Sequence, residues 1–133
     1  EILLSEISVE NLLNKNKYLS VSVNIARSEL LHLFETTGFT EAYFIDDYGK
    51  LVGKTKVNAV LSDSSTNIVQ ENSPLYIEKE SNISDAIIKI SNFVGESVPV
   101  VDRDQILIGV VTESDLFLEY LKVQDKISAI EKD

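Results

Sequence analysis

The chain has 133 residues, of which 44% are hydrophobic and 26% charged, a composition that fits one globular domain or two very small intertwined repeats. Its formal net charge of −10 repels a polyphosphate backbone and argues against a nucleic-acid partner. It contains no cysteine, which excludes disulfides and thiolate metal sites, and no apolar run approaches the roughly 20 residues that cross a bilayer, so we expect no direct membrane insertion.

The first elements in chain order are a short helix, a strand and a longer helix. A capped helix is predicted over residues 8–13 and a strand over 19–21. Apolar residues recur at helical spacing from residue 26 to 37, which predicts an amphipathic helix with one buried face. Asn24 is the expected N-cap of this helix and Gly38 its expected end.

Two apolar strands come next, joined by the polar stretch Asp46-Asp47-Tyr48-Gly49. Two adjacent carboxylates suggest a catalytic or metal site, but Asx-rich stretches with a Gly between apolar strands are usually turns. Asp102-Arg103-Asp104 occupies the equivalent place in the second half. Neither stretch has the His, Cys or converging acids of a metal centre. We therefore predict a tight turn at both places.

The second half of the chain repeats the first. Asp46 and Asp102, and likewise Gly53 and Gly109, are 56 residues apart. A strand over 75–77, opening on Leu75, stands at the same offset from the strand over 19–21.

The remaining elements complete the repeat. A second helical stripe over 83–94 has Asn82 as its expected N-cap and Gly95 as its expected end. A polar stretch over 62–67 should link the halves. After Asp115 a third apolar stripe predicts a helical tail that is longer than its counterpart in the first half.

Each repeat thus reads as strand-helix-strand-strand-helix, which predicts an α+β fold. A unit of about 56 residues buries too little surface to be stable alone. We expect the two repeats to pack sheet to sheet with pseudo-twofold symmetry. The first repeat with its lead-in helix is assigned to residues 1–66, and the second repeat with its helical tail to 67–133.

Two stretches in the second half carry a family resemblance. Val98-Pro99-Val100-Val101-Asp102 and Ile108-Gly109-Val110-Val111-Thr112-Glu113-Ser114-Asp115-Leu116 resemble the signature of a cystathionine-β-synthase-like (CBS) repeat. A degenerate copy at a fixed offset strengthens the resemblance, which extends from about residue 7 to about residue 120. It implies a Bateman module, in which two repeats enclose two clefts. Such modules often form flat dimers, and many bind adenosine-containing ligands and pass the occupancy to an attached channel, transporter or enzyme.

The resemblance implies roles for four residues of the second repeat. Asp115 would hold the ribose hydroxyls, and Thr112 would assist at the ribose or phosphate. The strand that carries Val98 and Pro99 would line the adenine slot. Thr112-x-x-Asp115 also has the spacing of a helix capping box, and both roles are compatible.

The two clefts are not expected to be equivalent. Lys56 and Ala59 of the first repeat stand where the second has Thr112 and Asp115. Since the side chain of Ala59 accepts no hydrogen bond, we expect at most one nucleotide site per chain. Lys54, like Lys56, is interpreted as a solvated rim residue in preference to a phosphate contact.

Tyr76 and Ile77, at the first strand of the second repeat, also belong to the candidate site. Tyr76 would either stack on a base or be an edge residue without a ligand contact. His32 is the single histidine and lies off the buried stripe, so a surface position is expected. One His without a Cys supports no nucleophile–base arrangement, and we expect no enzyme activity.

The resemblance implies a cytoplasmic, homodimeric regulatory module that senses AMP, ADP or ATP and needs no obligatory cofactor. The chain lacks an initiator Met, so we expect a piece of a larger protein or a chain trimmed of a tag. Its N-terminus also lacks the basic start of a signal peptide. The tail over 114–121 resembles that of bacterial voltage-gated chloride channels and chloride/proton antiporters, which implies a transmembrane parent. Cation transporters and stand-alone CBS proteins are the alternative parents, and a ligand-free dimerisation module is the alternative function.

Overall fold

The computed structural model describes residues 7–62, 68–93, 95 and 97–131, with the side chains beyond residue 125 left aside. Each half contributes one three-stranded sheet whose strands are in chain order. The elements of the first half are β1 (Ser20–Ser22), α1 (Arg27–Thr37), β2 (Glu41–Ile45), β3 (Leu51–Lys56) and α2 (Val57–Ser62). Those of the second half are β4 (Ile77–Glu78), α3 (Ile83–Lys89), β5 (Val98–Val101), β6 (Leu107–Val111) and α4 (Glu113–Glu131). The predicted α+β fold and its element order are confirmed.

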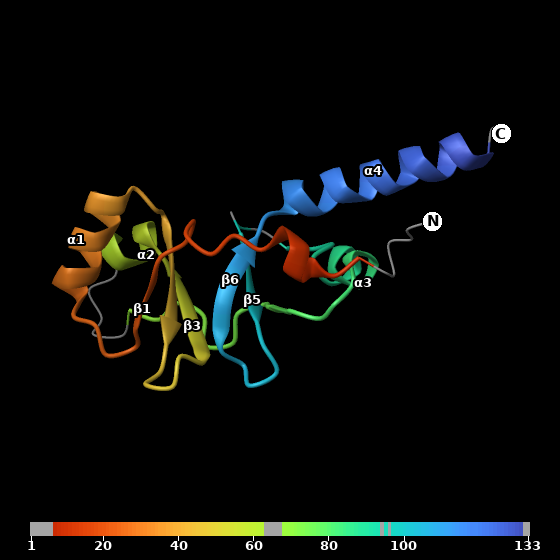
Figure 1. The fold of residues 1–133 in the computed structure, drawn as a ribbon. Helices are drawn as coiled ribbons and strands as arrows, with labels where there is room; N and C mark the ends of the chain where they lie inside the picture. Colours follow the sequence, from red (N-terminus) through yellow and green to blue (C-terminus); the bar gives the residue numbers. More distant parts are fainter. Residues whose placement is uncertain (1–6, 63–67, 94, 96, 132–133) are drawn as a thin grey trace.

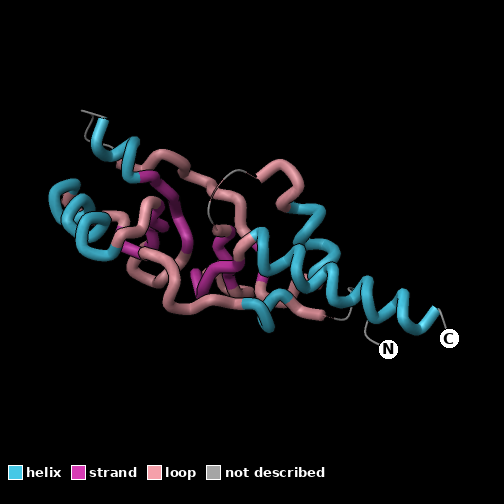
Figure 2. Tube along the Cα trace, turned by 90° about the horizontal axis from the view of Figure 1, so that it is seen from above, coloured by secondary structure: helices cyan, strands magenta, loops and turns pink. Residues whose placement is uncertain are grey.

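The two sheets have the same pairing pattern. The first strand of each runs parallel to the second, and the second runs antiparallel to the third. Even the irregularity in register recurs, between Phe44 and Ile45 in one sheet and between Val100 and Val101 in the other. The sheets lie side by side at the centre, with α1 and α2 beyond one and α3 and α4 beyond the other, and α4 projects from the body (Figures 1 and 2).

Each sheet forms a hydrophobic core with its own helices. Leu30 and Phe34 of α1 pack against Phe44 in the first core. Ile83 of α3 and Leu116 of α4 are fully buried in the second core. The apolar stripes predicted from helical spacing therefore face their own sheets.

The cores are completed by an exchange of segments between the halves. A 3₁₀ helix over Val9–Leu12 precedes the first repeat, yet Val9 is fully buried in the second core. In return, Ile68 and Val69, at the start of the second repeat, pack against the first core. The lead-in helix assigned by sequence to residues 1–66 thus packs on the sheet of the other repeat. The boundary proposed between residues 66 and 67 lies outside the described residues.

Two glycines permit this exchange. A Cβ on Gly109 would stand 2.7 Å from the Leu13 side chain and 2.8 Å from the carbonyl oxygen of Asn14. A Cβ on Gly53 would stand 2.7 Å from Val69. Real Cβ contacts are not this short, so the exchanged segments can cross β3 and β6 closely only because these positions lack a side chain.

Helix boundaries partly follow the predictions. Asn82 caps α3, its side chain accepting from the Asp85 amide at 2.8 Å, and Gly38 ends α1 in the left-handed region at φ 78°. The expectation for Asn24 was wrong, because α1 begins later and its N-cap position is Ala26, which has no capping side chain.

The end of α3 also differs from the prediction. The helix stops at Lys89, before Gly95, because Ile90 turns into the core and the Phe93 amide then donates to the Ile90 carbonyl. Ser91 and Asn92, which favour turns, follow at once. Val94, which sequence placed on the helix, lies outside the described residues.

The two hairpin turns confirm the turn prediction. Asp46 Oδ1 accepts from the amides of Tyr48 and Lys50, both at 2.9 Å. Asp102 Oδ1 accepts in the same way from the amides of Asp104 and Ile106. These carboxylates therefore organise turns. In the described part of the chain, no helix is long and apolar enough to cross a membrane.

Candidate functional site

Thr112 and Asp115 lie together at the start of α4. The strand β6 ends at Val111, so Thr112 follows directly at the N-terminus of the helix. The Thr112 hydroxyl accepts from the Asp115 amide at 3.0 Å, which confirms the capping interpretation. The Asp115 side chain is turned toward Asn14, whose Nδ2 donates to Oδ2 at 3.2 Å. Asn14 belongs to the segment exchanged from the other half.

A cavity of about 190 Å³ is lined by Asn14 and Thr112, while Asp115, which is hydrogen-bonded to both, lies outside the lining. Its walls come from both repeats, so residues far apart in sequence, such as Asn14 and Thr112, line the same cavity. The lining residues are Asn14, Lys17, Tyr18, Phe39, Glu41, Tyr43, Ser97, Val110 and Thr112. We call this cavity the Thr112 cleft. It is smaller than the roughly 300–1,000 Å³ of most ligand pockets, so a larger ligand requires the walls to part.

One wall of the Thr112 cleft is aromatic. The rings of Tyr18 and Tyr43 meet edge to face with centroids 6.3 Å apart, and Phe39 lines the same space. The Tyr43 hydroxyl lies 2.9 Å from both the carbonyl oxygen and Oγ of Ser97 and ties the two sheets together. Burial raises the pKa of Tyr18, which keeps its phenol neutral. Such a wall suits the face of an aromatic base.

The rest of the lining is polar. Lys17 is exposed, the Thr112 hydroxyl stands at the first turn of α4, and the Glu41 carboxylate lines the same cavity. The cleft therefore combines an aromatic region with polar groups of both charges.

The other predicted site residues are distributed over different surroundings. Pro99 is buried on β5 opposite Val110, which lines the cleft. The side chains of Ile77 and Val98 are fully buried in the second core. Tyr76 lies away from this lining, with the Lys89 ammonium 4.5 Å from its ring centroid. The structure thus brings Thr112 and Asp115 together, but not with these last three side chains.

The sequence reasoning missed eight of the nine lining residues, all except Thr112; they include Asn14, Tyr18, Glu41 and Tyr43. Two of them carried a usable signal, because Glu41 and Tyr43 stand 56 residues before Ser97 and Pro99. The cleft combines the helix start of the second repeat with the strand of the first. The predicted adenine-slot strand was taken from the same repeat as Thr112.

A second cavity, of about 330 Å³, lies at the pseudo-equivalent place and is lined by Thr40, Glu41, Lys56, Val57, Asn58 and Gly95. Lys54, the counterpart of Val110, is buried and its Nζ lies 2.7 Å from Glu41 Oε2. The same ammonium lies 5.1 Å from the ring centroid of Phe93. The prediction that Lys54 is a solvated rim residue is therefore wrong, because its charge is neutralised by Glu41 in the interface between the repeats. Lys56 is exposed, as expected.

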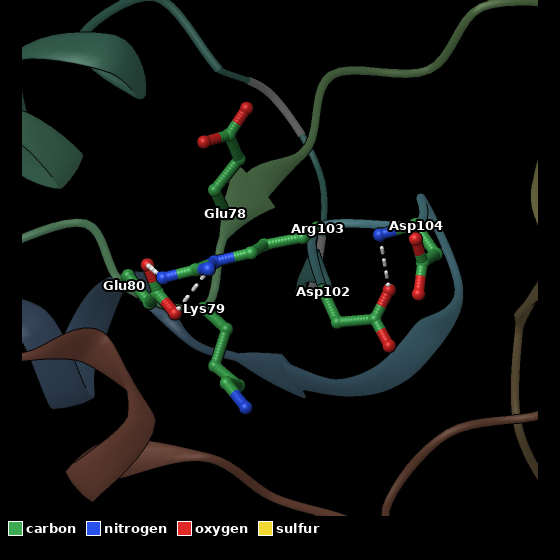
Figure 3. A pocket seen from close by; sticks show the side chains of 6 residues that line it. All are labelled: Glu78, Lys79, Glu80, Asp102, Arg103 and Asp104. Atoms are coloured by element: carbon green, nitrogen blue, oxygen red, sulfur yellow. Dashed lines mark hydrogen bonds and ion pairs between the residues drawn. The ribbon is translucent and has the colours of Figure 1, made fainter.

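A further hollow lies at the tip of the second hairpin and is polar throughout (Figure 3). Arg103 reaches across to Glu80 with two hydrogen bonds of 3.0 and 3.1 Å, which raise the pKa of Arg103. Asp102 faces the turn amides, while Lys79 extends away from the acids. Among the residues that the structure describes, no group of three or more His, Cys, Asp or Glu is arranged to hold a metal ion.

Comparison with known proteins agrees with this architecture. Residues 67–122 match the CBS domain family. No curated protein sequence matches the chain. A CBS domain pair/ACT domain protein from Thermotoga maritima is 20% identical, with a TM-score of 0.72 over 87% of this chain and 98% of that one.

Two ligand complexes are similar in fold. CBSX2 in complex with AMP is 22% identical with a TM-score of 0.71, over 89% of this chain and 98% of that one. The cytosolic domain of the Mg²⁺ channel MgtE in complex with ATP is 19% identical with a TM-score of 0.73, over 84% of this chain and 48% of that one. Residues 67–122 therefore match the CBS domain family, and the described chain has the fold of a CBS domain pair.

Proposed function

We propose that this chain is a cytoplasmic regulatory module, without enzyme activity, that binds an adenine nucleotide in the Thr112 cleft and modulates an attached transmembrane transporter. The observation that carries the proposal is the cleft itself, in which an aromatic wall of one repeat faces the start of α4 in the other. The AMP and ATP complexes named for two proteins of the same fold support the choice of ligand.

The residues of the cleft suggest how each part of the nucleotide would bind. The base would pack against Tyr18, Phe39 and Tyr43. Asp115 would accept hydrogen bonds from the ribose hydroxyls, while the first turn of α4 and Lys17 would hold the phosphate. The cavity of about 190 Å³ must widen to admit such a ligand. Binding would therefore favour a more open arrangement of the two sheets, and the attached protein would respond to that shift.

We propose a chloride channel or chloride/proton antiporter as the parent protein, on the resemblance of the tail over 114–121. The likeness to a Mg²⁺ channel domain supports attachment to a transporter of some kind. That domain is about twice as long as the part matched, since 48% of it is covered.

We also propose that two copies of the chain associate. Leu61 and Phe117, which are 56 residues apart, are 66% and 49% exposed, and Leu118 and Leu121 of α4 are 57% and 55% exposed. Apolar side chains repeated at pseudo-equivalent positions form a surface that a second copy can match in two-fold symmetry. Sedimentation equilibrium is expected to give a dimer.

The nucleotide proposal is tested by isothermal titration of the chain with AMP, ADP and ATP. We expect one site per chain, since Ala59 of the first repeat has no hydrogen-bond acceptor where the second repeat has Asp115. Asp115→Ala should weaken binding at least tenfold, because it removes a charged hydrogen-bond acceptor. Asp47→Ala, an exposed turn residue, is the control with the same charge change. Absence of heat and of a thermal shift at millimolar nucleotide would contradict the proposal.

The alternative function is a ligand-free dimerisation module, which the small cavity and Ala59 favour. It predicts that neither the wild-type chain nor Asp115→Ala responds to nucleotide, while both sediment as dimers. A nucleotide response that disappears in Asp115→Ala excludes this alternative.

A further inference from the structure

Asn14 occupies a fixed position between the exchanged segment and β6. Its amide donates to the Val110 carbonyl at 2.8 Å, and its carbonyl accepts from the Val110 amide at 2.9 Å. Leu13 beside it packs where Gly109 has no side chain. The backbone of Asn14 is thereby pinned on both sides, so its side chain has a limited set of positions.

That side chain meets the carboxylate proposed to bind ribose. Asn14 Nδ2 donates to Asp115 Oδ2 at 3.2 Å, between residues 101 apart in sequence. Asn14 also lines the cavity. An ionised carboxylate offers about four acceptor positions on two oxygens, so one amide donor orients the group and leaves most of its acceptor positions free. The bond to Asn14 selects one orientation of Asp115 and leaves acceptor positions for ligand hydroxyls.

The segment that carries Asn14 is anchored to the second repeat along its length. Val9 is fully buried in the second core, and its amide donates to the Ser81 carbonyl at 2.9 Å. The Ile83 amide at the start of α3 donates to the Ile7 carbonyl at 3.0 Å. Residues 7–14 are thus one strap along the second repeat, beside α3 and β6 (Figure 1).

The first repeat has the same backbone pairing but a different side chain. Glu71 is the counterpart of Asn14, since its amide and carbonyl pair with the carbonyl and amide of Lys54, both at 2.9 Å. The counterpart of Asp115 is Ala59, which has no acceptor to orient. An amide side chain at this place therefore meets a carboxylate only in the cleft that we propose to bind nucleotide.

We propose that Asn14 is a positioning residue for the nucleotide site, holding the Asp115 carboxylate in the orientation that receives the ribose hydroxyls. The inference rests on the proposed function of the Thr112 cleft. It also makes the strap over 7–14 the segment that responds to occupancy, because ribose and Asn14 share one carboxylate.

The test is a double-mutant cycle with titration calorimetry of the full chain. Asn14→Ala should weaken ATP binding about tenfold in the wild-type background and have no further effect in Asp115→Ala. The loss caused by Asn14→Ala should also shrink when the ligand is 2′,3′-dideoxy-ATP, which lacks both hydroxyls. Gln70→Ala removes an exposed amide side chain from the equivalent segment of the first repeat, and this control should bind ATP as the wild type does. Thermal unfolding without ligand verifies that each variant is folded.

The outcomes separate the two proposals. A wild-type chain that binds no nucleotide overturns the proposed function and this inference with it. If the wild type binds ATP but Asn14→Ala binds equally well, the inference alone fails. It fails also if Asn14→Ala weakens ATP binding equally in the Asp115→Ala background or with the dideoxy ligand, because Asn14 would then act independently of Asp115.

Discussion

At the scale of the single residue, Thr55 of β3 carries a buried hydroxyl that is not satisfied by a hydrogen bond within the described part of the chain. Thr55 is fully buried, and its Oγ1 has no hydrogen-bond partner within the described part of the chain. A buried hydroxyl without a partner costs roughly 1–3 kcal/mol of desolvation. The counterpart 56 residues later is Val111, which fills the same place in β6 with a methyl group.

We expect Thr55→Val to raise the free energy of unfolding by about 1 kcal/mol, because the two side chains have nearly the same shape. Urea denaturation measures the change. The reverse exchange, Val111→Thr, should destabilise the chain and serves as the matched variant. A loss of stability in Thr55→Val would contradict the prediction and would indicate that the hydroxyl finds a partner.

At the scale of the element, the two hairpins have different residues at one position where the backbone has a positive φ. Gly49 and Gln105 are counterparts and both have positive φ, 84° and 68°. This region costs an L-residue about 1–2 kcal/mol and glycine little. The carbonyls of both residues also receive cross-hairpin bonds of 3.1 Å, from Leu107 and Leu51, so the backbone cannot relax elsewhere.

Gln105→Gly should therefore stabilise the chain by up to about 1 kcal/mol. The relief of backbone strain in the folded state should exceed the cost of the greater conformational entropy that glycine gives the unfolded chain. Gly49→Gln should lower the stability. The shift in melting temperature of each variant is the measurement. Equal melting temperatures for Gln105→Gly and the wild type would show that the turn carries no strain.

The elements also show what sequence could and could not predict. The fold followed from repetition, since offset and periodicity assign strands and helices and indicate which faces are buried. The cleft did not follow, because Asn14 and Asp115 are 101 residues apart and periodicity does not tell which repeat supplies each wall. Lys54 was misplaced for a related reason: its partner Glu41 lies on the adjacent strand, and only the strand register puts both on one face.

At the scale of the whole molecule, the two repeats are joined by more than a shared surface. The Lys54–Glu41 pair is buried at the contact between them, and the Tyr43 hydroxyl bonds to Ser97 of the other half. Each core is completed by a segment from the start of the other half. Cooperative units are defined by such contacts and not by chain order, so we expect both repeats to unfold together.

Val9→Ala tests this expectation, because Val9 precedes the first repeat in sequence but lies in the second core. Removing two buried methyl groups should cost roughly 2 kcal/mol. If the molecule is one cooperative unit, the loss appears in a single transition, and amides of β2 and β5 lose protection from hydrogen exchange by the same amount. Glu10→Ala, at the exposed neighbouring position, is the control. Two separate transitions, with only the one that includes β5 shifted, would show instead that each repeat folds independently.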